Sequence, residues 1–277
     1  MLDFVYYPVS AVLWLWHAGF AALFGATSGA AWVAAIVMLV VTLRLALFRP
    51  YLAQVRFSRT MALLQPEIRR LRAECGDDRE RLASETRKLQ QQHNFSVLGG
   101  CLPLLGQTLM FLGLYHVLRS FDRTGASGSL FGGGHAMTPE QNAATANYLF
   151  SPELVRSFLQ ARLFGAPLSA TVTGSAGSVA TVVAVALPLL LIAAITTHCT
   201  ARASIARQLE STPQTRIINA MTLWLFPLGA LAAGLVLPVG ILIYFATSNT
   251  WTYVQQYLVH RRLDPPVAVA QPARPPA

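Results

Sequence analysis

The chain has 277 residues, of which 54% are hydrophobic and only 12% are charged, and its net charge is +9. Its mean hydropathy is +0.47. Soluble domains carry about 25% charged residues, so this composition excludes an ordinary soluble protein and indicates a polytopic membrane protein. The three cysteines, at positions 75, 101 and 199, fit no metal-binding spacing, so neither a zinc site nor a disulfide is expected.

The N-terminal segment, residues 1–29, is apolar and aromatic. It lacks the basic n-region and the small-residue cleavage site of a secretory signal, and no arginine flanks it to hold one end inside. Pro8 is expected to break its start, while Trp14, Trp16 and His17 suit a headgroup boundary. We therefore predict an amphipathic helix that lies in the outer interface of the bilayer.

Residues 30–48 form the first predicted transmembrane span, and they carry one charge, Arg44. A charged side chain within the hydrocarbon costs about 2.5–3.5 kcal/mol on the lenient insertion scales, so it usually faces a protein interior or a wet cavity. Arg44 lies only five residues before Arg49, however, and a long side chain near a helix end can extend to the interface. This segment alone leaves both readings open.

Residues 49–98 are polar, and positions 49–94 hold ten basic and six acidic residues, the strongest basic block in the chain. The positive-inside rule places this block in the cytosol. Apolar residues recur at coiled-coil spacing on both sides of a turn-like break at 75–78: Met61, Leu64, Ile68, Leu71, Leu82 and Leu89. We predict an antiparallel helical hairpin, which is either a solvated loop or a docking site for RNA, lipid headgroups or a partner protein.

Four further spans are predicted, at residues 99–119, 179–199, 217–237 and 238–259. The segments between and after them are an extracytoplasmic loop at 120–178 with a short surface helix at 153–164, a cytosolic loop at 200–216, and a proline-rich, disordered cytosolic tail at 260–277. In this arrangement sixteen basic residues fall inside and four fall outside, where the four include Arg119 at the outer end of a span. The predicted fold is an all-α, polytopic membrane protein with five spans, N-out and C-in.

The predicted spans contain no Asp or Glu, which argues against a proton- or cation-coupled transporter. No HExxH, GxSxG or paired-carboxylate motif is present, so we expect no catalytic residue, no metal and no cofactor. Polar groups do occur at inner-leaflet depth: Gln107, Thr197, His198, Thr247, Ser248 and Asn249. Each alone is most often a helix-packing hydrogen bond, but together with an unpaired Arg44 they indicate a wet cavity open to the cytosol.

Three ordered stretches, TLRLALFRP at 42–50, LQPEIRR through GGCLPLLGQ at 64–107, and PVGILIYFATSNTWTYVQQY at 238–257, resemble the YidC/Oxa family of membrane protein insertases, in particular its actinobacterial branch. The resemblance covers nearly the whole chain. It departs from the family at Phe245, where tryptophan usually follows the tyrosine at 244, and at 94–97, where an Asn-Pro turn is usual. The large outer domain of Gram-negative relatives and the long basic tail of others are missing, which predicts weak autonomous ribosome binding.

This resemblance implies an insertase and chaperone in the bacterial plasma membrane, with an inner-leaflet groove open to cytosol and lipid. Arg44 would attract acidic residues of a nascent membrane protein, and the hairpin at 51–94 would receive substrate, ribosome or targeting factors. The implied partners are nascent membrane proteins, the Sec translocon, the ribosome, the signal-recognition targeting machinery and the lipid bilayer, without direct nucleic-acid readout. The other groove residues would be Gln107, Thr197, His198, Tyr244, Phe245, Thr247 and Asn249.

Two alternatives belong to other functional classes. A small anion channel or transporter could use Arg44 as its selectivity charge, and it would conduct ions, whereas a groove sealed on the outside would not. A scaffold that holds the Sec translocon would tolerate the loss of Arg44 but not the loss of the hairpin. None of the three readings involves bond-breaking chemistry.

Overall fold

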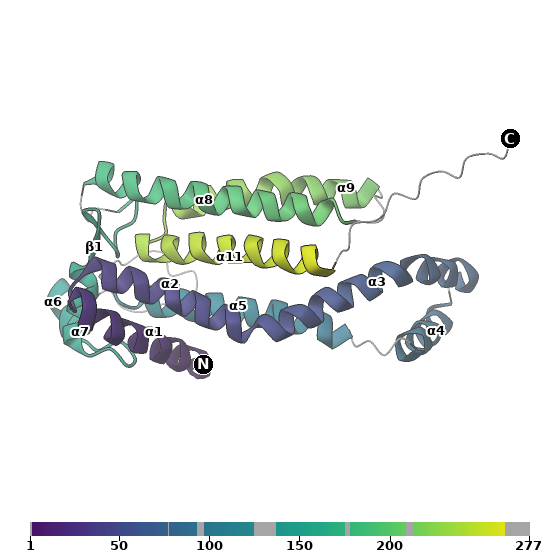
Figure 1. Ribbon diagram of the computed structural model, residues 1–277, viewed down its shortest axis with the longest axis horizontal. Coiled ribbons are helices and arrows are strands. Elements are labelled where there is room, and N and C mark those ends of the chain that lie inside the picture. The colour runs from purple at the N-terminus through teal and green to yellow at the C-terminus, as the bar shows by residue number, and fades with distance from the viewer. Residues whose placement is uncertain are drawn as a thin grey trace.

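The computed structural model describes residues 2–76, 78–92, 97–124, 137–174, 178–208 and 213–263. They form an elongated bundle of helices, with one helical arm extending along the long axis at one end (Figure 1). The elements are α1 (Asp3–Phe24), α2 (Gly29–Ala46), α3 (Phe48–Cys75), α4 (Arg79–Gln92), α5 (Val97–Arg119), α6 (Pro139–Ala144), α7 (Pro152–Gln160), β1 (Arg162–Leu163), β2 (Ala166–Pro167), α8 (Val179–Ile205), α9 (Pro213–Ala220), the π-helical turn η1 (Met221–Leu225), α10 (Phe226–Gly234) and α11 (Val239–Leu263).

Helix α11 lies at the centre of the bundle. It packs against α8 on one side and against α2 and α5 on the other, while α1 covers α2 and α5, and α10 packs on α8 (Figure 1). The core that joins these helices is apolar, and its largest fully buried side chains include Trp32, Leu114 and Ile241. The packing of aliphatic and aromatic side chains, with little help from charge, therefore holds the bundle together.

Four helices are long and apolar enough to cross a membrane by length and composition: Asp3–Phe24, Gly29–Ala46, Val179–Ile205 and Thr215–Gly234. Together with the dominance of helix, they make the chain an all-α membrane protein in its broad class, since the only strands in the described ranges are two residues long. This set differs from the five predicted spans, because it includes α1 and omits α5 and α11. The side chains of α5 are described only from Leu105, and α11 carries polar residues along most of its length.

Helices α2 and α3 meet without a loop at Leu47. The Leu47 N–H donates to the Leu43 carbonyl (3.0 Å) and the Tyr51 N–H donates to the Leu47 carbonyl (3.0 Å), so helical hydrogen bonding continues on both sides of the joint. Pro50 has no N–H to donate to Ala46, four residues earlier, which explains why the regular helix is interrupted here. The arm formed by α3 is therefore a direct extension of α2.

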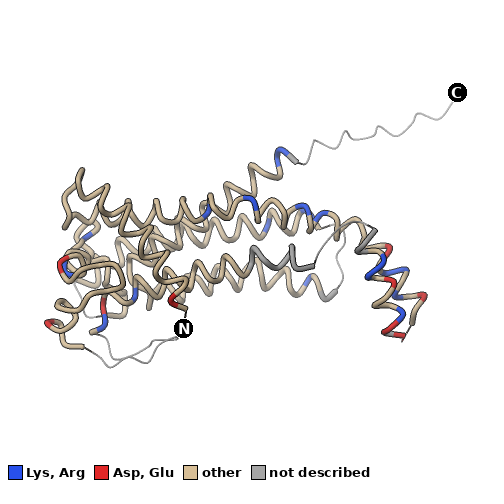
Figure 2. Tube along the Cα trace, turned by 90° about the horizontal axis from the view of Figure 1, so that it is seen from below, with Lys and Arg blue, Asp and Glu red and all other residues tan. Residues whose placement is uncertain are grey.

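The arm consists of α3 and α4, which contact each other and are separated by a break at Gly76, whose φ is +55°. Leu64 and Leu89, two residues of the predicted seam, are buried, although the other predicted seam residues remain partly exposed. Figure 2 shows many acidic and basic residues on this arm, a second charged group at the opposite end, and a mostly uncharged stretch between them. This charge distribution is the one expected of a protein that crosses a bilayer between two aqueous phases.

At the opposite end, α6, α7, the β1–β2 hairpin and the α1–α2 loop pack on the adjoining ends of α1 and α2 and on residues 117–124 and 145–151, and together they form a compact unit, which we call the cap (Figure 1). The hairpin pairs Arg162 with Pro167 and Leu163 with Ala166, and both residues of its turn have positive φ, Phe164 at 47° and Gly165 at 87°, as a tight two-residue hairpin requires. The surface helix predicted at 153–164 is thus shorter, because it ends at Gln160 and the chain turns into the hairpin.

Two expectations about the N-terminal segment are wrong. Pro8 lies inside α1 instead of breaking it. His17 is not an exposed interfacial group: it is 1% exposed, it stacks on Trp32 with ring centroids 3.8 Å apart, and its Nε2 donates to the Ala26 carbonyl (3.2 Å). Sequence spacing could not reveal that α1 turns this face toward α2. The predicted tail is helical up to Leu263, and residues 264–277 lie outside the described part of the chain.

Candidate functional site: the Arg44 groove

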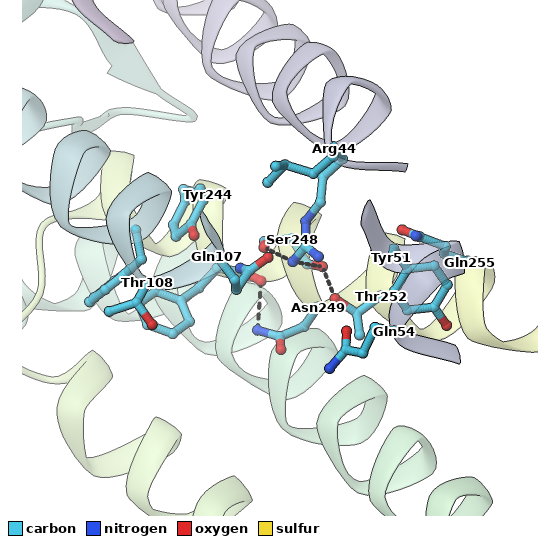
Figure 3. A pocket seen from close by; sticks show the side chains of 13 residues that line it. Arg44, Tyr51, Gln54, Gln107, Thr108, Tyr244, Ser248, Asn249, Thr252 and Gln255 are labelled. Carbon is cyan, nitrogen blue, oxygen red and sulfur yellow. Dashed lines mark hydrogen bonds between the residues drawn. The ribbon is translucent and has the colours of Figure 1, made fainter. Parts of the chain in front are cut away.

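A cavity of about 490 Å³ lies between α2, α3, α5 and α11, in the half of the bundle that leads into the arm. We call it the Arg44 groove (Figure 3). It is lined by Arg44, Leu47, Tyr51, Gln54, Gln107, Thr108, Phe111, Tyr244, Phe245, Ser248, Asn249, Thr252 and Gln255. Arginine is the only charged residue type among them, so the groove carries one cation and no carboxylate of its own.

The Arg44 guanidinium is held from one side. Its Nη2 donates to the Ser248 hydroxyl (2.6 Å) and to the Ser248 backbone carbonyl (3.2 Å), as the dashed lines in Figure 3 show. The Nε atom is buried and has no hydrogen-bond partner among the described residues. Both acceptors are uncharged, so the positive charge is not neutralised, and an incompletely paired buried cation is energetically costly.

The wall formed by α11 presents one face of the helix, because Tyr244, Ser248, Thr252 and Gln255 recur at intervals of four, four and three residues. Its polar groups are bonded within the protein. The Thr252 hydroxyl donates to the Ser248 carbonyl (2.9 Å), and Gln255 Oε1 accepts from the Trp251 indole (2.6 Å). This wall therefore uses part of its hydrogen-bonding capacity within the protein.

The Asn249 side chain also makes two hydrogen bonds within the protein. Its amide nitrogen donates to the Phe245 carbonyl (2.8 Å), and its Oδ1 accepts from the Thr197 hydroxyl (3.2 Å). Because Thr197 lies on α8, this pair ties α8 to α11 behind the groove. Asn249 thus supports the wall more than it offers a free group to a ligand.

The opposite wall comes from α3 and α5. Phe111 packs against Tyr244 and Phe245, with ring centroids 6.0 and 5.6 Å away, and forms an apolar side of the groove. Tyr51 lies on α3, past the end of the first predicted span, where burial raises the pKa of its phenol, while Arg207 and Arg44 oppose this shift. A phenol with an ordinary pKa is already protonated at neutral pH, so the shift leaves the Tyr51 hydroxyl neutral there.

The structure brings five of the predicted groove residues together, namely Arg44, Gln107, Tyr244, Phe245 and Asn249. The other three do not line the groove. Thr197 lies behind it, in contact with Asn249. These three residues are predicted from their depth in the membrane, which does not indicate the direction in which each helix face points.

His198 and Thr247 have structural partners elsewhere. The His198 Nδ1 donates to the Leu223 carbonyl (3.1 Å) in the π-helical turn η1, and the Thr247 hydroxyl donates to Ile243 on its own helix (2.8 Å). A π turn displaces backbone carbonyls from regular α-helical pairing, so His198 supplies a partner for one of them. Neither residue contributes to the groove.

Sequence reasoning missed several lining residues. Ser248 was noted only as part of a polar run, although its spacing from Tyr244 and Thr252 would have placed all three on one face. Tyr51 and Gln54 lie past the end of the first span, and nothing in the sequence showed that α3 continues α2 closely enough to line the same cavity.

Within the described ranges, no group of three or more His, Cys, Asp or Glu side chains is placed to hold a metal ion. The lining of the groove offers hydrogen-bonding groups and one positive charge. Such a site can bind polar, acidic or partly unfolded peptide segments and anions.

The chain is similar to known membrane proteins over most of its length. A family model described as "60Kd inner membrane protein" matches residues 23–266. Two proteins named "Membrane protein insertase YidC", from Mycolicibacterium paratuberculosis and Mycobacterium tuberculosis, are each 44% identical over 273 residues, covering 95% of this chain and 76% and 74% of their own lengths. A protein of the same name from Streptomyces avermitilis is 30% identical over 282 residues, covering 99% of this chain and 61% of its own length. The matched region contains every residue that lines the Arg44 groove. The chain therefore belongs to the 60Kd inner membrane protein family, in agreement with the resemblance found in the sequence.

Proposed function

We propose that this protein is a membrane protein insertase and chaperone of the bacterial plasma membrane, and that the Arg44 groove receives polar or acidic segments of its substrates. The names of the relatives support the insertase activity. One observation carries the role of the groove: the partly buried Arg44 guanidinium, whose buried Nε has no partner among the described residues, faces a cavity whose described lining contains no carboxylate. An acidic side chain of a substrate would supply the missing counter-charge.

The mechanism needs no energy-coupling site. A polar segment that enters the groove has a shorter low-dielectric path to cross. Each charge that avoids the hydrocarbon in this way lowers the free-energy cost of insertion by several kcal/mol. The adjoining apolar helix of the substrate then partitions into the lipid, and burial of its apolar surface drives the step. In this mechanism Arg44 binds and positions the substrate, and no covalent bond is made or broken.

The proposed topology has five spans, formed by α2, α5, α8, α9–α10 and α11, with the N-terminus outside and the C-terminus inside. The α3–α4 arm then lies in the cytosol as a hairpin, where it could contact the ribosome, targeting factors or the Sec translocon. The concentration of arginines at that end of the molecule supports this orientation (Figure 2). Helix α1 lies at the outer interface in this arrangement.

Purified protein in liposomes tests the proposal. The substrate is a small single-span protein with an acidic tail that must cross, and protease protection measures its insertion. Wild type should insert it, Arg44→Lys should retain most of the rate, and Arg44→Ala should slow it about tenfold or more, since a charge-assisted hydrogen bond contributes about 1.5–3 kcal/mol. A matched substrate whose acidic residues are replaced by Asn and Gln should depend much less on Arg44.

Other outcomes separate the alternatives. Equal insertion by wild type and Arg44→Ala would keep the insertase and remove the role of the charge. Anion conductance without insertion would favour the channel. Loss of activity after shortening the arm, with Arg44 dispensable, would favour the scaffold.

A further inference from the structure

The two walls of the Arg44 groove differ in how completely their polar groups are bonded. Ser248, Asn249 and Gln255 on α11 all have hydrogen-bond partners within the protein. Gln54 on α3 and Gln107 on α5 line the same cavity, but neither side-chain amide has a hydrogen-bond partner among the described residues. Figure 3 shows Gln107 near the Arg44 head group and Gln54 farther along the cavity, next to Thr252.

The free groups on this wall suit a particular ligand chemistry. A glutamine amide offers one carbonyl acceptor and two N–H donors and carries no charge. A peptide backbone offers the complementary pair, one N–H and one C=O in each residue. Because a backbone group without a partner is energetically costly in an apolar environment, a segment that enters the membrane region before it is helical needs such partners most.

We infer that Gln54 and Gln107 bind the peptide backbone of a substrate segment that has not yet formed a helix, whatever its side chains are. This inference rests on the proposed insertase function and names what the groove recognises besides acidic side chains. The two amides come from different helices and face one space, so a single extended segment can contact both while Arg44 binds an acidic side chain if one is present. Backbone groups are common to all proteins, so this mode of binding tolerates many sequences.

The test uses synthetic single-span peptides with a neutral tail, which removes any contribution of charge pairing with Arg44. One peptide has a tail of glycine and serine. The second has the same tail with N-methylglycine in place of glycine, which removes N–H donors from the backbone. Insertion rates are measured in liposomes that contain the full-length protein as wild type, as the double variant Gln54→Leu/Gln107→Leu, or as Gln160→Leu, an exposed glutamine at the end of α7 that serves as the matched control.

The ratio of variant rate to wild-type rate is compared between the two tails, so that differences in spontaneous insertion cancel. The double variant should insert the glycine–serine tail about tenfold more slowly than wild type, as expected for two lost hydrogen bonds. On the N-methylated tail its deficit should shrink to about twofold. Gln160→Leu should match wild type on both.

Two results overturn the inference. One is a double variant that inserts the glycine–serine tail as fast as wild type. The other is an equal deficit on both tails, which would point to hydration of the groove or to damaged folding instead of backbone binding. Failure of wild type to insert either peptide or the acidic substrate would instead reject the proposed function itself.

Discussion

The cap and the Arg44 groove lie toward opposite ends of one bundle, and both contain polar side chains among apolar helices. In the cap these groups bond to one another or to backbone: the Trp32 indole donates to the Ser157 hydroxyl (3.0 Å), and Ser157 and His17 both donate to the Ala26 carbonyl. In the groove, Arg44 Nε is buried without a hydrogen-bond partner among the described residues, and the partly exposed amides of Gln54 and Gln107 face the cavity.

The comparison shows that polarity in a membrane helix does not by itself mark a site. Asn142 and Asn147 in the cap are 1% exposed, and each donates to a carbonyl near the end of α5, that of Phe121 (2.9 Å) and that of Val117 (3.2 Å). They close that end of the bundle. The groove differs because part of its hydrogen-bonding capacity has no partner among the described residues.

The cap should be the more sensitive region to loss of packing, and Trp32→Ala should have the largest effect. Trp32 is fully buried, with the rings of Phe121, Phe150 and Phe158 at 5.5, 5.7 and 5.1 Å. Truncation should lower the free energy of unfolding by about 3–5 kcal/mol, measured by thermal unfolding in detergent. Trp224→Ala, at a side chain 61% exposed, is the control and should cost much less; equal losses would contradict a cap held by its aromatic core.

The second largest loss of stability is expected where two backbone segments of the cap pack closely. A Cβ at Gly29 would lie 1.8 Å from the Arg162 carbonyl oxygen, whereas a Cβ at Gly19 would meet nothing within 4 Å. Gly29→Ala should therefore lower the free energy of unfolding by about 1–3 kcal/mol through overpacking. Gly19→Ala should leave it unchanged or raise it slightly, because alanine favours helix. The same detergent measurement checks both, and a tolerated Gly29→Ala would show that the α1–α2 loop adjusts easily.

The smallest effect is expected when an arginine is replaced by methionine. The resulting change in the free energy of unfolding should have opposite signs in the groove and in the cap. Arg44→Met should raise the free energy of unfolding by about 1 kcal/mol, since an incompletely paired buried cation is often less stable than an apolar side chain of similar size, and it should slow insertion of acidic substrates. Arg123→Met is the matched variant in the cap. Arg123 donates to the carbonyls of Ser120 (2.7 Å) and Ala146 (3.0 Å), so its loss should destabilise the protein. If both variants destabilise, the groove is no more strained than the cap.

The sequence predicts most of the helices, because long apolar runs, a basic polar block and the break after Cys75 are local signals. Arg44 was identifiable for the same reason, as a single charge in an apolar run. The family resemblance added Tyr244 and Phe245, both of which line the groove.

What the sequence could not predict depends on how helices face one another. Thr197 and His198 are adjacent in the chain, yet one bonds to Asn249 on α11 and the other to Leu223 in η1, so neither reaches the groove. The sequence around His17 is typical of a membrane interface, and only the packing of α1 on α2 buries this side chain. The sequence did not identify Gln54 as a site residue. Gln54 reaches the groove only because α3 continues α2, and the position of the arm in the folded protein sets this continuation.

That continuation has a mechanical consequence. The joint at Leu47 lies three residues after Arg44 and four before Tyr51, and helical hydrogen bonds run into it from both sides. We therefore expect the arm to move as a lever whose pivot is part of the groove. A load applied to the far end of α3 should then tilt Tyr51 and Gln54 relative to Arg44, because no loop separates α2 from α3.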